Sequence, residues 1–325
     1  MHPGNTISSP TARTGRALGH AVLRGSNVLA LLALIVAASL LSPYFLELRN
    51  IMNVLRGASV LCIVAVGMTL VILSRGVDLS AGSILGMAGA SLALVAALDA
   101  KLAIAAALAM GAAIGLVNGV LIACLGLQPF IATLATLIAA RGLVYIVSDG
   151  ANIIVRDPPA WFEAIGSGHL GPVPIPVLIA ASVVLAFVFL LTQTPFGRHV
   201  YAVGANEEAA RLYGVNVKRT KILVYTLSGV LAGLASLIQV SRLTVAEPNA
   251  GQLIELDAIA ATLIGGTTFD GGVGGVPGTV LGVLILAVLG NLLNLKGVSP
   301  FVQMVLQGVI IVLAVVVSEL RQRRR

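Results

Sequence analysis

The sequence predicts an all-α fold: a polytopic membrane helix bundle of about ten transmembrane helices, some of them broken or short. Its 325 residues are 58% hydrophobic and only 10% charged, with a mean hydropathy of +1.02. Soluble globular domains do not reach this composition. The apolar residues also come in long runs, whereas the charged residues gather between the runs. These observations exclude a soluble enzyme and leave no length for a separate soluble domain.

Ten apolar segments follow one another along the chain, and each full crossing needs roughly 20 residues. The expected spans cover residues 28–41, 51–73, 84–98, 102–124, 129–147, 177–191, 222–240, 257–266, 280–295 and 301–318. The basic leader 1–27 is long for a signal peptide and has no convincing A-x-A cleavage site, so the first span is expected to stay uncleaved. The eighth segment is expected to cross as a short or broken helix.

Glycines repeat every four residues within several of these spans. The repeats are Gly82 and Gly86, then Gly111, Gly115 and Gly119, and finally Gly229 and Gly233. This spacing places the glycines on one face of a helix, where two backbones can approach each other closely. We therefore expect a densely packed bundle between residues 28 and 318, the transmembrane domain.

The distribution of Lys and Arg predicts the orientation of the bundle. Thirteen of them lie in the N-terminal tail 1–27, in residues 74–80, in the loop 193–221 and in the C-terminal tail 319–325. The opposite ends of the spans carry five, namely Arg49, Lys101, Arg156, Arg242 and Lys296. Because cytoplasmic loops are enriched in basic residues, both tails and the loop 193–221 are expected in the cytoplasm and the loop 149–176 outside. The net charge of +7 then reflects orientation in the membrane rather than nucleic-acid binding.

The polar loop 193–221 carries the signals of one short helix. Asn206 is a favoured N-cap residue, and Glu207 and Glu208 follow in the first turn, where negative charge is favourable. Gly214 stands where the chain must leave the helical conformation. The loop is therefore expected to hold a brief, well-defined helix outside the bilayer.

One face of this short helix is apolar. Ala209, Leu212 and Tyr213 fall at positions i, i+3 and i+4, which share a side of a helix. Since the flanking charges keep the helix out of the membrane, such a face is expected to fit a groove in another protein.

Polar residues also interrupt the apolar runs. Residues 74–83 and 257–278 combine glycines, hydroxyls and carboxylates, and irregular backbone at membrane depth must be buried in protein or line water. The candidates for a solute path are Asp78, Ser80, Ser83, Asn118, Thr133, Thr136, Asn291 and Asn294. Two alternatives stay open: Asp78 can instead cap the next helix, and the amides, including Gln303 and Gln307, can instead join helices by hydrogen bonds.

The sequence contains no catalytic or metal-binding constellation. The four histidines, His2, His20, His169 and His199, are far apart and have no ligand spacing. The glycine-rich run 265–275 lacks the Gly-Lys-Ser/Thr ending of a nucleotide-binding loop. Cys62 and Cys124 lie in apolar runs and are expected to be buried as small hydrophobic residues rather than joined as a disulfide.

Five long motifs together resemble one protein family. They read AVGMTLVILSRGVDLSAGS, QPFIATLATLIAARG, FGRHVYAVGANEEAARLYGVNVKRTKI, ELDAIAATLIGGTTFDGGVGG and LNLKGVSPFVQMVLQGVIIVLAVVV. In this order they resemble the permease subunits of monosaccharide ABC importers, above all the ribose-type members. The spacing from Glu208 to Gly214 resembles the motif by which ABC permeases dock onto their ATPase. Arg75 and Asp270 depart from the family pattern, which usually has small or neutral residues there.

The resemblance implies partners and a division of labour. It implies a homodimer in the bacterial inner membrane, a cytoplasmic ABC ATPase that uses ATP and Mg, and a periplasmic or lipid-anchored sugar-binding protein. This chain would bind no cofactor and would not be an enzyme. The residues implied in coupling to the ATPase are Asn206, Glu207, Glu208, Ala209, Leu212, Tyr213 and Gly214.

The substrate implied is a monosaccharide, ribose or a similar pentose or hexose. Only 4% of the residues are aromatic, so few stacking surfaces exist for a sugar ring, and affinity is expected in the external binding protein. An ion-coupled secondary sugar transporter is the alternative. It would need intramembrane charges, for which only Asp78, Asp257 and Asp270 are candidates.

Overall fold

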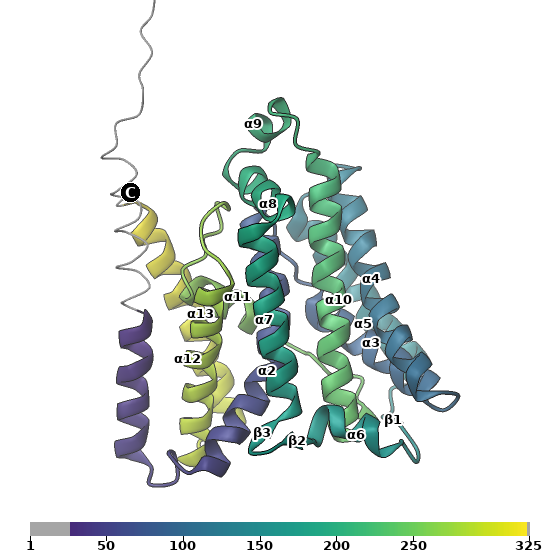
Figure 1. Cartoon of the computed structure of the whole chain (residues 1–325), viewed down its shortest axis with the longest axis vertical. Coiled ribbons are helices and arrows are strands. Elements are labelled where there is room, and N and C mark those ends of the chain that lie inside the picture. Colours follow the sequence, from purple (N-terminus) through teal and green to yellow (C-terminus); the bar gives the residue numbers. More distant parts are fainter. Residues whose placement is uncertain (1–26, 324–325) are drawn as a thin grey trace, which may run out of the picture.

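The computed structural model describes residues 27–323, and within them nearly every element is a helix (Figure 1). Six helices in this described range are long and apolar enough to cross a membrane: α2 (Leu48–Leu73), α4 (Ala100–Ala123), α5 (Pro129–Ser148), α7 (Ile175–Gln193), α10 (Val217–Leu243) and α12 (Val276–Leu295). Three shorter apolar helices are Asn27–Leu41, α3 (Ala81–Ala96) and the first part, Pro300–Val312, of α13 (Pro300–Arg323). The all-α membrane bundle is confirmed, whereas the count of ten spans is not.

The predicted eighth span contains a short helix. This helix, α11 (Ile254–Ile264), has 11 residues, or about 16 Å of rise, which is roughly half the thickness of a bilayer core. At the ends of the chain, nearly all of the predicted tail 1–27 lies outside the described residues, and α13 continues as helix to Arg323, into the segment predicted as a C-terminal tail.

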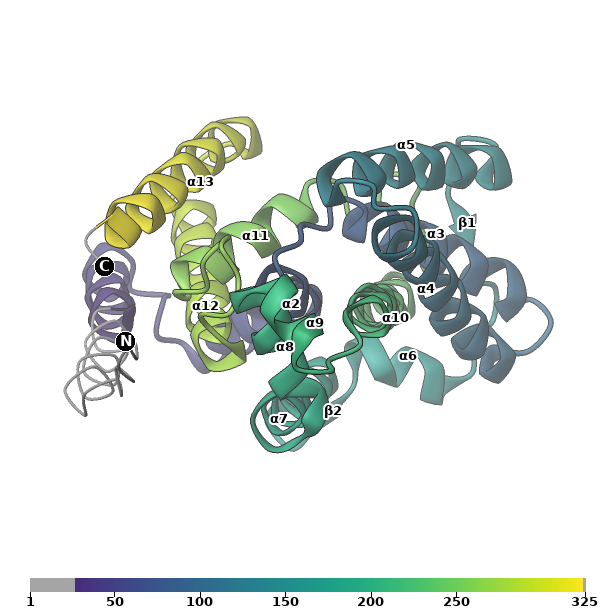
Figure 2. The same cartoon turned by 90° about the horizontal axis from the view of Figure 1, so that it is seen from above.

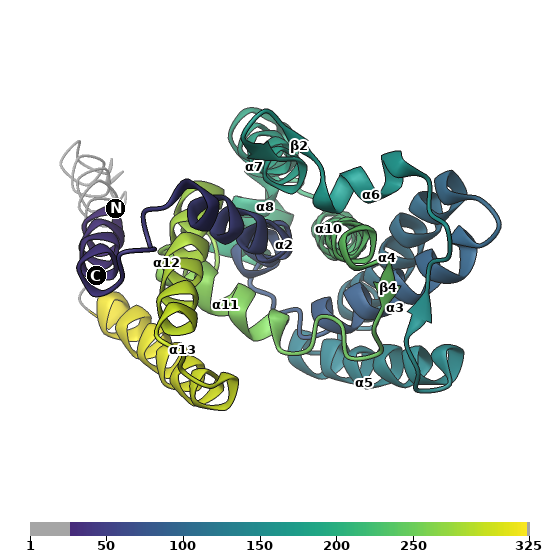
Figure 3. The same cartoon turned by 90° about the horizontal axis from the view of Figure 1, so that it is seen from below.

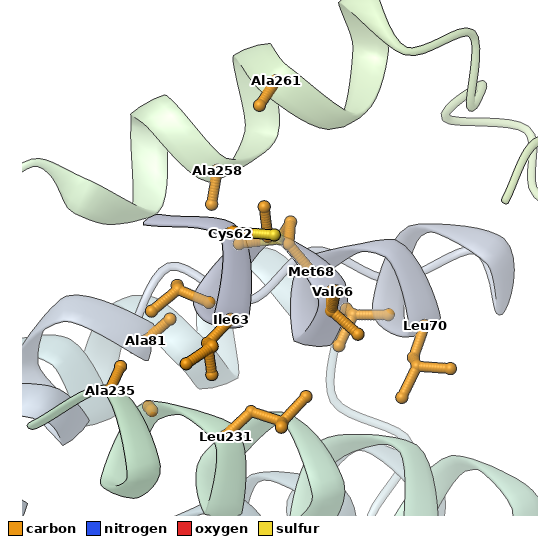
Figure 4. Packing of buried hydrophobic residues seen from close by; sticks show 14 of the residues in the cluster. Cys62, Ile63, Val66, Met68, Leu70, Ala81, Leu231, Ala235, Ala258 and Ala261 are labelled. Atoms are coloured by element: carbon orange, nitrogen blue, oxygen red, sulfur yellow. The ribbon is translucent and has the colours of Figure 1, made fainter. Parts of the chain in front are cut away.

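Two helices, α2 and α10, occupy the centre of the bundle. Seen along the bundle, α3, α4 and α5 lie on one side of them, and α11, α12, α13 and the helix Asn27–Leu41 lie on the other (Figure 2 and Figure 3). The second half of α2 is buried almost completely, because α10 covers one of its faces and α11 another (Figure 4). Cys62 belongs to this core, as predicted.

The predicted close approach of glycines occurs between α4 and α10. A Cβ atom on Gly111 would lie 2.2 Å from the carbonyl oxygen of Gly229, and one on Gly115 would lie 2.4 Å from that of Tyr225. Real Cβ atoms do not approach a carbonyl oxygen so closely, so only glycine permits the two backbones to touch. The prediction for Cys124 was wrong: it lies just past α4 and is exposed, because an apolar run faces lipid as readily as it faces protein.

The two large loops lie at opposite ends of the bundle (Figure 1). One end carries α6 (Ala160–Ser167) and two small antiparallel pairs, β1 (Ile153–Ile154) with β4 (Val245–Ala246) and β2 (His169–Leu170) with β3 (Val173–Pro174). The other end carries α8 (Pro195–Ala205) and α9 (Glu207–Leu212). The loops 149–176 and 193–221 therefore face opposite sides of any membrane that the long helices cross.

Candidate functional site

The loop 193–221 is folded as two successive helices rather than one. The helix α8 precedes the predicted short helix, and sequence reasoning missed it. Its buried residues, Gly197, Val200, Val203 and Gly204, follow a helical spacing of three or four, which was a signal available in the sequence. The helix packs onto the end of α2, where a Cβ on Gly204 would lie 1.8 Å from the carbonyl oxygen of Leu73.

The predicted short helix is present as α9. The side-chain oxygen of Asn206 accepts a hydrogen bond from the backbone N–H of Ala209 at 2.9 Å, which confirms the cap. At the other end Gly214 has φ of 83°, and two bonds close the helix, from its N–H to the oxygen of Arg211 and from the N–H of Val215 to that of Ala210. This pattern is a Schellman motif, which requires a left-handed residue at the glycine.

One side of α9 is bound to the protein and the other is free. Ala210 is buried together with Val203 and Val217, and the ammonium of Lys221 pairs with the carboxylate of Glu207 at 2.6 Å. On the opposite side Leu212 is 79% exposed and Tyr213 is 90% exposed. The predicted apolar face is thus reduced to these two side chains, since Ala209 is partly covered, while Glu208 is exposed beside them.

Four of the predicted path residues, Asp78, Ser80, Asn118 and Thr136, meet in one hydrogen-bonded chain, and a fifth, Thr133, bonds the backbone beside it. Starting from α10, the Ser228 hydroxyl donates to Asp78 Oδ2 at 2.9 Å, and both the backbone N–H and the hydroxyl of Ser80 donate to Asp78 Oδ1. The Asn118 amide on α4 donates to the Ser80 hydroxyl at 2.8 Å, and the Thr136 hydroxyl on α5 donates to Asn118 Oδ1 at 2.6 Å. The chain ties α10, the start of α3, α4 and α5 together.

The chain includes Asp78 and Ser80 of the segment 74–80, where the backbone leaves the helix and most side chains except Arg75 are still covered by the protein. The carbonyl of Val77 accepts hydrogen bonds from the hydroxyls of Thr133 and Tyr225, both at 3.4 Å, so backbone groups without helical partners are satisfied by side chains. Asp78 does not cap α3, whose N-cap residue is Ser80. Tyr225 and Ser228 were not predicted, because nothing in the sequence marks a partner about 150 residues away.

The other predicted path residues lie outside this chain. Ser83 is buried in the first turn of α3. On the opposite side of the bundle Asn291 exchanges two amide hydrogen bonds with Asn50, at 3.0 and 2.9 Å, and joins α12 to α2. The side-chain oxygen of Asn294 accepts from Gln303 of α13 at 2.9 Å. For these amides the structure shows the interhelical hydrogen bonds that were the alternative to a path role.

Two charged residues within the bundle were not among the predicted sites. One guanidinium nitrogen of Arg141 on α5 donates to the carbonyl oxygens of Pro248 and Ala250, at 2.7 and 2.9 Å, and holds the segment before α11. The carboxylate of Glu255 lies against Gly82 of α3 and is almost fully buried. Both therefore help to fix where α11 begins.

The glycine-rich run 265–275 closes the end of the bundle that carries α8 and α9. The N–H of Gly272 donates to the carbonyl oxygen of Leu73 at 2.9 Å, the same oxygen against which Gly204 packs. Arg75 and Asp270, the two departures from the family pattern, are both exposed at this end, and the Arg75 side chain lies against Gly271. Three segments thus meet at the last turn of α2.

Comparison with known proteins gives a consistent result. The model of the family described as "Branched-chain amino acid transport system / permease component" matches residues 50–315. The ribose import permease protein RbsC of Escherichia coli (strain K12) is 46% identical over 308 residues, covering 93% of this chain and 95% of the relative. Its counterpart in Bacillus subtilis (strain 168) is 45% identical over 295 residues, covering 89% and 91%.

A permease for another sugar is also similar. The galactose/methyl galactoside import permease protein MglC of Escherichia coli (strain K12) is 37% identical over 324 residues, covering 93% of this chain and 95% of the relative. No solved structure matches the chain.

Proposed function

Since the chain belongs to the family of the branched-chain amino acid transport system permease component, we propose that it carries a monosaccharide, ribose or a similar pentose or hexose, across the bacterial inner membrane. As a permease subunit of an ABC importer it is a transport component and not an enzyme. The choice of sugar is supported by relatives that are named for ribose and galactose import. The alternative, an ion-coupled secondary transporter, has no support among these relatives.

The observation that carries the coupling role is the free face of α9. Leu212 and Tyr213 project from a helix that is capped at both ends and anchored by buried Ala210. A rigid apolar projection of this kind fits a groove and loses little conformational entropy on docking. In this proposal the groove belongs to the partner ATPase, which uses ATP and Mg, while this chain binds neither. A sugar-binding protein delivers the sugar at the opposite end of the bundle.

The test of the energy source is uptake by the reconstituted complex. Uptake is expected to persist when the proton and sodium gradients are collapsed and to stop when the ATPase cannot hydrolyse ATP. The sugar is identified by adding loaded binding protein and measuring which monosaccharide stimulates ATP hydrolysis. Uptake that follows an ion gradient and ignores ATP would reject the importer.

We also propose that both termini and the loop 193–221 are cytoplasmic and that the loop 149–176 is external. The basic residues favour this orientation, and the two loops lie at opposite ends of the bundle (Figure 1). A reporter fused after Asn206 is expected to read as cytoplasmic and one fused after Asp157 as external. The opposite reading at either position would overturn the orientation.

The assembly is proposed to be a homodimer. Large apolar side chains remain exposed along α5 and α13, among them Phe130, Ile138, Ile146, Phe301 and Val305, and lipid or a second copy of the chain must cover them. Mass measurement of the complex in a native membrane mimetic tests the stoichiometry.

Within this proposal the buried chain around Asp78 keeps a place beside the sugar path. Asp78, Ser80, Asn118 and Thr133 are fully buried, and their hydrogen bonds hold the broken segment 74–80 in position. Their contribution to transport would then be to fix the backbone rather than to touch the sugar.

A further inference from the structure

A cavity with six polar side chains in a largely apolar lining opens between α2, α11, α12 and α13. Its volume is about 460 Å³, which lies in the range of small-molecule sites in proteins. It is bounded by the first half of α2, the second half of α12 and the first half of α13, so it lies toward the end of the bundle opposite α9. In the proposed orientation this is the outer half of the membrane.

Six polar side chains line this cavity on helices that are otherwise apolar. They are Asn53, Asp257, Asn291, Asn294, Gln303 and Gln307. Polar groups at membrane depth are costly unless they bond one another or face water or a solute. Some of these do bond one another: Gln307 donates to Asp257, and Gln303 donates to Asn294.

Hydrogen-bonding capacity nevertheless remains around the cavity. Asp257 forms no ion pair with any side chain that the structure describes. Its second carboxylate oxygen, the carbonyl oxygen of Gln307 and the N–H₂ group of Asn294 have no partner among the described residues. The side chain of Asn53 makes no hydrogen bond with any residue that the structure describes. The cavity therefore offers both donors and acceptors.

This set of groups matches a neutral polyhydroxylated molecule. Each sugar hydroxyl donates one hydrogen bond and accepts others, a carboxylate accepts, and an amide does both. No Lys or Arg lines the cavity to hold an anion, and no aromatic residue lines it to stack on a sugar ring. Binding here would be weak, which suits a site that must release its solute onward.

We propose that this cavity is a transit subsite where a monosaccharide rests in the outer half of the membrane, with Asp257 and Asn294 bonding its hydroxyls. The inference rests on the proposed function, because it names where within the permease the sugar pauses. It also assigns a role to Asp257 that needs no ion coupling, namely hydrogen-bond acceptance from a hydroxyl.

Two glycines permit a test that leaves the polar groups and the fold in place. Gly57 and Gly290 line the cavity, and a Cβ added at either meets no atom within 4 Å. Gly57→Leu and Gly290→Leu therefore fill the cavity without pushing on a backbone. Gly308→Leu is the matched control, because Gly308 is also helical, also has open space at its Cβ and does not line the cavity.

The measurement is ATP-driven uptake of the sugar that stimulates the parent complex, together with ATP hydrolysis. Uptake by the two cavity-filled variants is expected to fall at least tenfold, with their ATP hydrolysis retained and with Gly308→Leu transporting like the parent. Asp257→Asn, which keeps the shape but removes the charge, is expected to slow uptake less, by roughly three- to tenfold, as the weakening of one ordinary hydrogen bond does.

The outcomes separate the subsite from the proposed function. Normal uptake by Gly57→Leu and Gly290→Leu in a complex that is driven by ATP would overturn the subsite alone. An equal loss in Gly308→Leu would also overturn it, because added bulk and not the cavity would be responsible. A parent complex whose sugar uptake does not depend on ATP would overturn the proposed function and the subsite with it.

Discussion

The two sides of the bundle use glycine in opposite ways. Between α4 and α10, a Cβ on Gly111 or Gly115 would collide with a backbone carbonyl of the other helix. Around the cavity between α2 and α12, a Cβ on Gly57 or Gly290 would meet nothing within 4 Å. The same residue type closes one interface and leaves the other open.

The α4–α10 side, called the frame below, is tightly packed, whereas the α2–α12–α13 side contains a cavity. The α4–α10 side has its backbones in contact, and its polar groups are enclosed in a complete hydrogen-bonded chain around Asp78. The α2–α12–α13 side has a cavity, and its polar groups keep unused hydrogen-bonding capacity. A permease needs both, because a solute requires space to pass and rigidly packed helices that keep this space in place.

The largest expected effect comes from adding volume to the frame. Gly115→Leu places carbon 2.4 Å from the carbonyl oxygen of Tyr225, and the helices must separate, which costs upward of about 3 kcal/mol. Folded protein recovered from membranes is expected to fall to a small fraction of the parent amount. Gly142→Leu on α5, whose Cβ would meet nothing within 4 Å, is the control and is expected to fold normally. Equal recovery of both variants would remove the distinction between the two sides.

Gly214, at the end of α9, offers a variant that is expected to lose coupling to the ATPase and to keep its fold. At Gly214 there is open space, but φ is 83°, a conformation that a β-branched residue adopts only with strain of about 1–2 kcal/mol or more. Gly214→Val is expected to disturb the end of α9 and to lower sugar uptake about tenfold, with normal insertion and assembly. Uptake and membrane content are measured together.

The matched control for that variant is Gly126→Val. Gly126 follows α4, has φ of 70° and also has open space at its Cβ, so the strain is similar but lies away from α9. It is expected to transport far better than Gly214→Val. If both lose uptake alike, α9 has no special role in coupling.

Two aspartates within the bundle, Asp78 and Asp257, extend the comparison to a smaller expected effect. Asp78 uses both carboxylate oxygens as acceptors, so Asp78→Asn puts a donor where an acceptor is needed and is expected to cost about 1–3 kcal/mol of stability. Asp257→Asn changes a group that faces the cavity and is expected to leave stability nearly unchanged. Thermal unfolding in detergent measures both, and equal losses would contradict a closed frame beside an open cavity.

The smallest expected effect lies outside the membrane, at the turn before α4. Asp99 caps this helix, and backbone hydrogen bonds from Leu102 and Lys101 hold the pKa of its carboxyl below the ordinary value of 3.8. The ionised form is the one that caps, so its contribution to stability is present above that value and is lost as the pH falls through the lowered pKa.

Asp99→Ala is therefore expected to unfold at a slightly lower temperature than the parent at neutral pH. The difference between the two proteins should vanish when the pH is brought well below 3.8. A difference that stays constant with pH would mean that the carboxylate does not act as a cap.

Much of this architecture was predictable because its signals are local. Hydropathy alone marks the long helices, and Asn206 and Gly214 mark the ends of α9 through their own side-chain and backbone chemistry. The helix α8 was not predicted because its apolar stripe, Val200 and Val203, is narrow and lies within the polar loop 193–221.

The sequence indicated which polar residues are candidates for a site, but not how these residues bond to one another. Asp78 and Asn118 were recognised as candidates, but their bonding through Ser80, and the bond from Ser228, depend on how distant helices face one another. Hydropathy does not tell lipid from protein interior, since both favour apolar groups, and this is why Cys124 was expected to be buried. The cavity is formed by four elements and has no sequence signature.

The carbonyl oxygen of Leu73 joins three segments at one end of the bundle. This oxygen accepts a hydrogen bond from the N–H of Gly272, just before α12, and the backbone of Gly204 on α8 packs against it. We therefore expect a displacement of α8 and α9 to move the neighbouring ends of α2 and α12 together. Because the opposite ends of α2 and α12 line the cavity, such a movement is expected to change the width of the cavity.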